Sequence, residues 1–358
     1  MFNYEARAGH LRAALRKTRA DAFITSFLPH VRYLTGYSGS NGLCIVTDSS
    51  LTLLTDFRYQ EQIEAEVPLA SKHIVKGDLF AAAVKEKLLS YFGSVAFEEG
   101  YLPVGSFQLL KEKLPQVRLV PSSGIVESLT AVKEGSEIAL IKKAAEITER
   151  VFEKVLGIVK PGISENDIAA EIGYLHRKFG AEKDSFDTIV ASGTRGSLPH
   201  GAASSKKIQK GEMVTLDFGC VYQGYCSDLT RTVAVGTPSS EVKKIYQIVL
   251  DAQRSAIHAA HSGLPAKKLD AVARSLIEKK GFGKFFGHGL GHGIGLQVHE
   301  SPRLFAKSKH LLCAGNVVTI EPGIYLPGKF GVRIEDDVVI HNGACEVITS
   351  SPKELIVV

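Results

Sequence analysis

The chain has 358 residues, 44% hydrophobic and 23% charged, which is typical of a soluble globular protein and long enough for two domains. Its net charge of +5 comes from scattered lysines and arginines, which argues against a nucleic-acid partner. No apolar run approaches the roughly 20 residues that span a bilayer, no signal peptide pattern is visible, and the five cysteines lack CxxC pairing, so we expect a cytoplasmic protein without membrane contact.

Helical and strand patterns alternate over the first 127 residues, which predicts a small α/β domain. Leu11, Ala14 and Leu15 indicate a helix over residues 5–18. A further helix is expected over 79–91. Short apolar runs bounded by Gly, Ser and Asp predict strands over residues 22–25, 43–47, 51–55 and 95–97. Residues 121–135 form the expected boundary, which gives domains 1–127 and 128–358.

The second domain is predicted to begin with a pair of helices. Apolar residues at helical spacing indicate a helix over 136–159, with Ser136 as its N-cap. Its partner begins at Ser164 and ends near Gly180. A second pair is expected over 240–261 and 265–280, and strand-like runs follow each pair. This repeated order suggests an internal duplication.

Two aspartates flank a predicted β-hairpin. Gln223-Gly224 lies between alternating apolar residues and is a turn signal. With this turn, Asp217 and Asp228 lie diagonally on one face of the hairpin. Because the two carboxylates repel each other, a divalent cation between them is expected. Two solvent-exposed aspartates on a surface hairpin are the alternative.

Three histidines and two glutamates lie in strand-like contexts further along the chain. His288 and His292 belong to the stretch HGLGHGIGLQVHE, which ends with His299 and Glu300. Its four glycines would each cost roughly 1 kcal/mol in a helix, so a strand and loop are expected. A glycine-rich surface loop with incidental histidines is the alternative. Taken singly, Glu321 and Glu335 would be ordinary acids at strand ends.

Together, these positions form a candidate metal site with four carboxylates and one imidazole: Asp217, Asp228, His292, Glu321 and Glu335. This donor set suits Mn²⁺, Co²⁺, Fe²⁺ or Zn²⁺, and the lack of a thiolate favours a harder ion, so Mn²⁺ is the expected ion. Four carboxylates nearly balance the charge of two divalent ions. The sequence therefore predicts a two-metal site.

The same residues lie in motifs that resemble those of the pita-bread-fold metallopeptidases, and within them the Xaa-Pro aminopeptidases and Xaa-Pro dipeptidases (prolidases). The motifs occur in order over residues 135–358: DFG, SDLTRT, HGLGHGIG, EPG and RIED. In the N-terminal region, RYLTGYSGSNG and TDFRY resemble the smaller domain of these enzymes. The resemblance implies an α+β protein: a pita-bread (creatinase/aminopeptidase-like) catalytic domain preceded by an N-terminal α/β creatinase-like domain.

The resemblance also implies roles for the five ligands. Asp217 would bind one metal ion, His292 and Glu321 would bind the other, and Asp228 and Glu335 would bridge both. A hydroxide held between the ions would attack the carbonyl carbon that precedes proline. Glu321 would also act as a proton shuttle.

Four further residues match active-site positions of these enzymes. His200, His288 and His299 match histidines that stabilise the tetrahedral intermediate or position the substrate, and a neutral or protonated imidazole can donate to a developing oxyanion. Arg333 matches an arginine beside the ligands, where it can orient a carboxylate. Without the resemblance, His200 would be interpreted as an ordinary loop histidine.

The expected function is therefore hydrolysis of the N-terminal Xaa-Pro bond of short proline-containing peptides by a homodimeric Xaa-Pro aminopeptidase. An Xaa-Pro dipeptidase is the alternative, although no residue that would hold a dipeptide's carboxylate is evident. A methionine aminopeptidase usually lacks the N-terminal domain. A non-catalytic binding module, or a creatinase-like hydrolase without metal, would have lost ligands that are intact here.

The N-terminal domain carries one further hypothesis. In dimeric relatives this domain approaches the active site of the partner subunit. Arg58 and Tyr59, in the TDFRY segment, are therefore candidates for setting the length of substrate that the enzyme accepts.

Overall fold

A computed structural model describes residues 2–358. Its internal contacts divide the chain into two compact units, Met1–Thr130 and Ala131–Val358. The division lies at the end of helix α6 (Ile125–Thr130), and the boundary expected after residue 127 lies inside this helix. No helix in the described part of the chain is long and apolar enough to cross a membrane.

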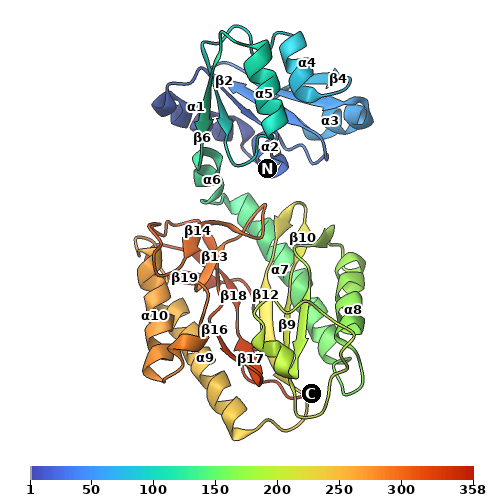
Figure 1. The fold of residues 1–358 in the computed structure, drawn as a ribbon, viewed down its shortest axis with the longest axis vertical. Coiled ribbons are helices and arrows are strands. Elements are labelled where there is room, and N and C mark those ends of the chain that lie inside the picture. Colours follow the sequence, from blue (N-terminus) through green and yellow to red (C-terminus); the bar gives the residue numbers. More distant parts are fainter. Residues whose placement is uncertain (1) are drawn as a thin grey trace. The chain divides into compact units, whose positions relative to one another are not determined.

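The N-terminal unit is built on a six-stranded mixed sheet (Figure 1), as expected for an α/β domain. The strand order is β4-β3-β2-β1-β5-β6, in which β1 pairs antiparallel with β2 and parallel with β5. The strands are β1 Ala22–Thr25, β2 Leu43–Thr47, β3 Leu51–Asp56, β4 Ser71–Val75, β5 Ser94–Glu98 and β6 Arg118–Ser122. With α6, the helices are α1 Tyr4–Thr18, α2 Leu28–Thr35, α3 Gln60–Glu66, α4 Leu79–Lys85 and α5 Val104–Lys113.

Helix α4 is shorter than predicted. The helix expected over 79–91 ends at Lys85, because Lys87 adopts a left-handed conformation with φ of 58°. In the part that does form, Phe80 and Ala83 pack with Leu110 of α5 in one apolar core.

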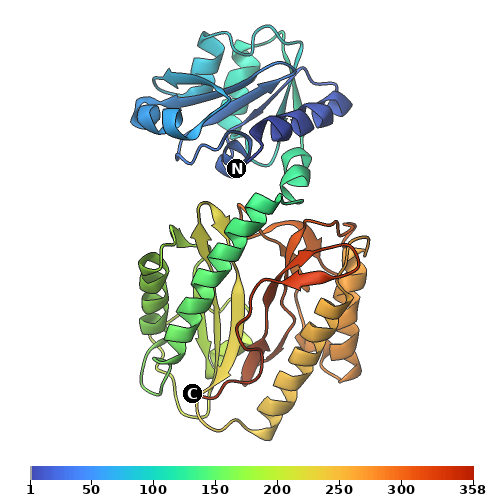
Figure 2. The same ribbon diagram turned by 180° about the vertical axis from the view of Figure 1, so that it is seen from behind.

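The C-terminal unit contains two helix pairs, each followed by strands (Figures 1 and 2), which matches the predicted order. The long first helix is capped by Glu134 rather than Ser136, because Glu134 and Glu137 form a reciprocal capping box. The expected Ser136 cap is therefore wrong. The helices are α7 Gly135–Leu156, α8 Glu165–Lys178, α9 Ser240–Ala259 and α10 Ala266–Lys279.

Strands of this unit form several small sheets that meet around the predicted ligands. After the first helix pair come β7 Lys183–Asp184, β8 Ile189–Ser192, β9 Met213–Phe218, β10 Cys220–Tyr222, β11 Tyr225–Cys226 and β12 Leu229–Ala234. After the second come β13 Gly291–Gly293, β14 Glu300–Leu304, β15 Val317–Ile320, β16 Gly323–Leu326, β17 Phe330–Arg333, β18 Asp336–Ile340 and β19 Cys345–Val347. The sheet orders are β12-β9-β8, β11-β10-β7, β14-β13-β15-β18-β19 and β16-β17.

The predicted hairpin is present. Tyr222 pairs with Tyr225 across the turn, and Asp217 pairs with Thr230 in the same register. The strands divide into two sheets at Gly219, where a Cβ atom would lie 1.8 Å from the carbonyl oxygen of Ser227. Because Asp228 is two residues from Thr230, it is the diagonal neighbour of Asp217, as predicted.

Apolar cores hold these strands in place from the helix side. Residues of α9 and α10, such as Val249 and Leu269, pack with Val318, Ile320 and Val332 in one buried cluster. A second cluster joins α7 and α8 to β9 and β12. Each fully buried aliphatic side chain contributes about 1.5–3 kcal/mol, so the strand ends that carry the ligands rest on a rigid base.

Candidate metal centre

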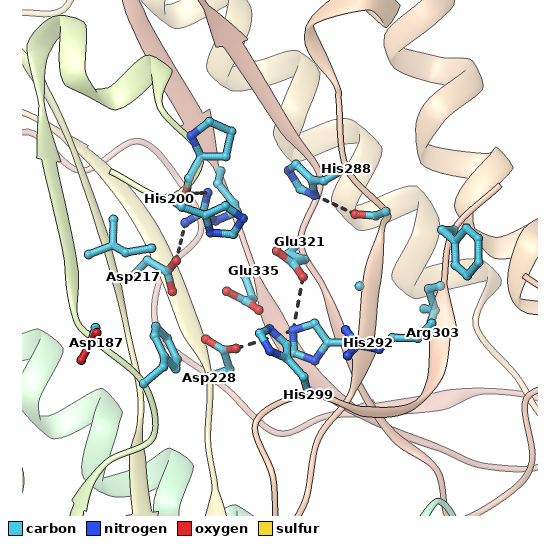
Figure 3. Close-up of a pocket in the computed structure, with 18 of the residues that line it drawn as sticks. Asp187, His200, Asp217, Asp228, His288, His292, His299, Arg303, Glu321 and Glu335 are labelled. Carbon is cyan, nitrogen blue, oxygen red and sulfur yellow. Dashed lines mark hydrogen bonds and ion pairs between the residues drawn. The ribbon is translucent and has the colours of Figure 1, made fainter. Parts of the chain in front are cut away.

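The structure brings the five predicted ligands to one cavity of about 760 Å³. Each comes from a different strand or strand end: Asp217 from β9, Asp228 just before β12, His292 from β13, Glu321 just after β15 and Glu335 between β17 and β18. Figure 3 shows their side chains facing one another across the cavity floor.

Asp228, His292 and Glu335 form the tightest group. One ligand atom from each lies within 4.8 Å of those of the other two. The Nε2 atom of His292 lies 3.8 Å from Oδ2 of Asp228 and 3.4 Å from Oε1 of Glu321. Asp217 accepts a hydrogen bond from Arg333 on the other side of the cavity.

The glycines beside His292 have a steric purpose. A Cβ atom on Gly291 would lie 2.0 Å from the carbonyl oxygen of Thr319, and one on Gly293 would lie 2.1 Å from that of Ser301. The backbone on either side of His292 therefore passes directly against neighbouring strands, which only glycine permits. The stretch is a strand and loop, as predicted, and not an incidental surface loop.

Hydrogen bonds orient His292 for ligation. Its Nδ1 lies 3.0 Å from the carbonyl oxygen of Gly293, which fixes the proton on that nitrogen. Burial, followed by the nearby His299, lowers the pKa of His292 to about 3, so the ring is neutral. The lone pair of Nε2 therefore faces the carboxylates, as in metal-binding histidines.

Arg333 pairs with Asp217, but Asp228, Glu321 and Glu335 form no ion pair with a lysine or arginine among residues 2–358. Burial, and then the neighbouring carboxylates, raise the pKa values of Asp228 and Glu335 well above the ordinary range. Burial also raises the pKa of Glu321 to about 7. Oδ1 of Asp228 and Oε1 of Glu335 are buried without a hydrogen-bond partner. Orphaned oxygens beside a neutral imidazole fit divalent cations.

Further hydrogen bonds hold the ligand side chains. The hydroxyl of Thr230 donates to Oε2 of Glu335 at 2.5 Å. The hydroxyl of Thr319 donates to Oε1 of Glu321 at 3.3 Å and accepts from the backbone N–H of His292 at 3.1 Å. These contacts orient the carboxylates, as the surroundings of metal ligands commonly do.

The predicted histidines also line the cavity: His200, His288 and His299. The ring of His299 is nearly perpendicular to that of His292, with centroids 4.4 Å apart. His288 Nε2 lies 2.9 Å from the hydroxyl of Tyr325, and burial followed by Arg333 lowers the pKa of His288 to about 4. His200 is exposed on a loop at the edge of the cavity.

Arg333 joins several of these groups. It donates to Asp217, to the hydroxyl of Tyr325 at 2.7 Å and to the carbonyl oxygen of Pro199 at 3.1 Å. Tyr325 was not expected from the sequence. It completes a chain of contacts from His288 through Arg333 to Asp217.

The sequence-based prediction also missed Arg303. Its exposed side chain lines the cavity, and it forms no ion pair with any carboxylate among residues 2–358. Arg303 lies in β14, four residues after His299, and nothing in its local sequence marks it as a residue of the site. Phe305 and Asp187 also line the cavity and were not predicted.

An open cavity with clustered carboxylates and a neutral imidazole at its floor defines a metal-dependent hydrolase. The chain belongs to metallopeptidase family M24, whose model matches residues 139–342. A creatinase/prolidase N-terminal domain model matches residues 7–132.

Individual relatives agree with this assignment. An Xaa-Pro dipeptidase of Pyrococcus horikoshii is 39% identical over 341 residues, which is 95% of each chain. The solved structure of an Xaa-Pro dipeptidase from Bacillus anthracis matches with a TM-score of 0.96 and 41% identity, covering 99% of this chain and 100% of that one. An X-Pro aminopeptidase from Thermotoga maritima matches with a TM-score of 0.90 and 39% identity, covering 97% and 100%. The expected pita-bread fold is confirmed.

Proposed function

We propose that this metallopeptidase hydrolyses the Xaa-Pro bond of dipeptides, as an Xaa-Pro dipeptidase. The sequence had favoured an Xaa-Pro aminopeptidase, with the dipeptidase as the alternative. The names of the relatives support the alternative better, although one of them is an aminopeptidase. The observation that carries the proposal is Arg303, a guanidinium in the cavity without an ion-pair partner among the described residues.

Arg303 provides a cation that could bind the free carboxylate of a dipeptide. In a dipeptide the proline carboxylate follows directly after the scissile bond, so a cation near the metal ligands would bind it. A guanidinium binds a carboxylate through two parallel hydrogen bonds. A longer peptide has an uncharged amide at that position, which leaves Arg303 without a partner.

The proposed ligand set is Asp217, Asp228, His292, Glu321 and Glu335, with two divalent ions. When bound, the ions supply Lewis-acid activation of water and of the scissile carbonyl. Mn²⁺ is the proposed ion because the donor set is mostly carboxylate.

The chain's own groups carry the remaining steps. The carboxylate of Glu321 accepts a proton from the attacking water and delivers it to the proline nitrogen, which has no N–H of its own. The oxygen of the water becomes part of the new carboxylate, its second proton is released to solvent, and the C–N bond breaks. The imidazoles of His200 and His299 donate to the substrate oxygens, His288 accepts from the hydroxyl of Tyr325 at the cavity wall, and Arg333 holds Asp217 in place.

The test uses the metal-stripped enzyme reloaded with Mn²⁺, with Ala-Pro, Ala-Pro-amide and Ala-Pro-Ala as substrates. We expect a strong preference for Ala-Pro. Arg303→Ala should raise KM for Ala-Pro roughly 10- to 100-fold, because a charge-assisted hydrogen bond contributes about 1.5–3 kcal/mol. The amide should be unaffected by the substitution. Lys307→Ala, an exposed cation on the same segment, is the matched control.

Two results would change the proposal. Preference for Ala-Pro-Ala with no effect of Arg303→Ala would assign an Xaa-Pro aminopeptidase. If the metal-loaded protein cleaves none of the three substrates, the proposed specificity for proline is wrong. Met-Ala peptides would be tested next. A homodimer, also proposed from the family resemblance, is tested by analytical ultracentrifugation.

A further inference from the structure

Two charged side chains of α10 contact the irregular segment 286–290, which leads into β13. Asp270 and Arg274 lie one helical turn apart and form a two-pronged ion pair. Nε of Arg274 is 2.7 Å from Oδ2 of Asp270, and Nη2 is 2.8 Å from Oδ1. Asp270 is fully buried, so this pair differs from the exposed ion pairs that are common on helix surfaces.

The remaining hydrogen bonds of the pair go to the backbone of segment 286–290. Arg274 donates to the carbonyl oxygen of Phe286 at 3.0 Å and to that of His288 at 2.7 Å. Oδ1 of Asp270 accepts from the N–H of Leu290 at 3.1 Å. Irregular backbone needs partners for its buried polar groups, and here α10 supplies them on both sides of His288.

Further contacts fix the imidazole within this segment. The guanidinium of Arg274 lies over the ring of Phe286, 4.3 Å from its centroid, and that ring meets His288 edge-on at 5.1 Å. Nδ1 of His288 donates to the carbonyl oxygen of Gly289 at 2.7 Å, which leaves Nε2 as an acceptor. A Cβ atom on Gly289 would lie 2.7 Å from the carbonyl oxygen of Leu304, so the backbone is also held from the side of β14.

The segment meets the candidate metal centre at two points. Nε2 of His288 accepts from the hydroxyl of Tyr325 at 2.9 Å, and the same hydroxyl accepts from Arg333. The carbonyl oxygen of Leu290 accepts from the backbone N–H of Glu321 at 2.8 Å. Through these contacts the segment sets the position of a hydroxyl at the cavity wall and of a proposed metal ligand.

We propose that Asp270 and Arg274 are positioning residues for peptide hydrolysis, an inference that rests on the proposed function. Neither side chain lines the cavity. They act by holding segment 286–290 against α10, and through it the hydroxyl of Tyr325 and the backbone of Glu321. A guanidinium suits this task because it donates in several fixed directions at once, which the compact ammonium of a lysine cannot reproduce.

The kinetic test compares Arg274→Lys and Asp270→Asn with the wild type, all loaded with saturating Mn²⁺. We expect kcat for Ala-Pro to fall about 10- to 100-fold, because a displacement of about 1 Å can cost 100-fold in rate. KM should change far less than kcat, because Arg303 belongs to β14 and not to the held segment. Lys268→Gln removes an exposed cation of α10 and should change neither value.

Two controls separate positioning from a merely structural role. Metal content and the circular dichroism spectrum of each variant should match those of the wild type at the assay temperature. A variant that melts at a lower temperature but keeps the wild-type kcat would overturn the proposal, because the pair would then support the fold alone. Asp270→Asn keeps the shape of its side chain and decides the question if Arg274→Lys does not fold.

Crystal structures of the variants test the proposal without a substrate. In Arg274→Lys we expect segment 286–290 to shift and the 2.9 Å contact between His288 and Tyr325 to be lost, whereas Lys268→Gln should keep it. An unchanged segment would overturn the proposal. Failure of the proposed function is a different result: a wild-type enzyme that prefers Ala-Pro-Ala, or cleaves none of the substrates, would refute the dipeptidase, and the variant structures would still decide this inference.

Discussion

At the scale of single residues, the metal centre is a place where the apo-protein is electrostatically unfavourable. Four carboxylates share one cavity, and Arg333 is the cation that contacts one of them. Removing the metal leaves this repulsion uncompensated. The proteins with and without metal should therefore respond differently to pH.

The first prediction concerns that response. The pKa of Glu321 is raised from 4.5 to about 7, chiefly by burial, so the folded apo-protein binds this proton more tightly than the unfolded chain. Its contribution to stability is complete below about pH 4.5 and is lost as the pH rises through about 7. The loss is on the order of 3 kcal/mol at most, because the side chain is partly exposed. Apo-protein melted at pH 5 and pH 8 should show this fall, and apo Glu321→Gln should show less of it. Equal slopes for the two proteins would contradict the assignment.

Arg303 is a cavity residue that could not be predicted from the sequence. The five proposed ligands could be grouped from the sequence because carboxylates and an imidazole after apolar runs have few other uses in combination, and all five line one cavity in the structure. Arg303 could not, because its place in the cavity depends on the pairing of β14 with β13, in a register that shifts between Gly291 and Gly293. An arginine on a strand is otherwise an ordinary surface residue.

At the scale of elements, the loop that carries His200 is held by a helix on the far side of its strand. Glu165, fully buried in the first turn of α8, accepts from the N–H and hydroxyl of Ser192, from Arg195, and from the N–H and hydroxyl of Ser204. One carboxylate thus fixes both ends of the loop. The loop in turn places Pro199 against Arg333.

We expect Glu165→Gln to lower both stability and activity, because an amide cannot accept all five hydrogen bonds. Unfolding by urea should lose about 1–3 kcal/mol. The value of kcat/KM should fall while metal content stays unchanged, because the metal ligands lie on other elements. Glu171→Gln, on the same helix, is the control and should change neither quantity. A loss of metal in Glu165→Gln would show a wider disturbance than proposed.

Helices could be predicted from the sequence where apolar spacing and the residues at their starts determine them. The helices expected over 240–261 and 265–280 are confirmed as α9 and α10, since their apolar spacing and their starts at Ser239 and Pro265 are encoded locally. Helices α2 and α5 were not predicted. They are short, with 8 residues in α2 and 10 in α5, and helices of this length depend on tertiary packing.

At the scale of the whole molecule, metal binding should be coupled to folding of the C-terminal unit. The proposed ligands come from five different strands or strand ends, so they meet only in the folded chain. An ion that binds them therefore stabilises the folded state relative to the unfolded chain. Adding Mn²⁺ to the apo-protein at 100 times its dissociation constant should stabilise it by about 2.7 kcal/mol per site. Calorimetric melting with Mn²⁺, and with Mg²⁺ for comparison, measures this. A melting temperature that no divalent ion raises would contradict the site.

The N-terminal unit offers a prediction about substrate length. Its two family-like segments are linked, because Asn41 donates to Asp56 at 2.6 Å, Arg58 donates to Asp56 at 2.8 Å and Ser40 pairs with Tyr59. If this surface limits the substrate in a dimer, Arg58→Ala and Tyr59→Phe should change the Ala-Pro to Ala-Pro-Ala ratio of kcat/KM about 3-fold, or about 0.6 kcal/mol. Metal content should not change. An unaltered ratio in both variants would remove the support for this role.

The spread of the ligands along the chain also matters while the protein is being made. Asp217 and Glu335 are 118 residues apart (335 − 217), and ribosomes add about 5–20 residues per second, so roughly 6–24 s separate their synthesis. The N–H of Glu335 then bonds to the carbonyl oxygen of Thr230, which joins the late segment to the early hairpin. A nascent chain thus holds its first two aspartates long before it can complete the centre. If Glu335 is a ligand, as proposed, the peptidase would be inactive on the ribosome until the segment that carries Glu335 has been translated and has paired with the hairpin.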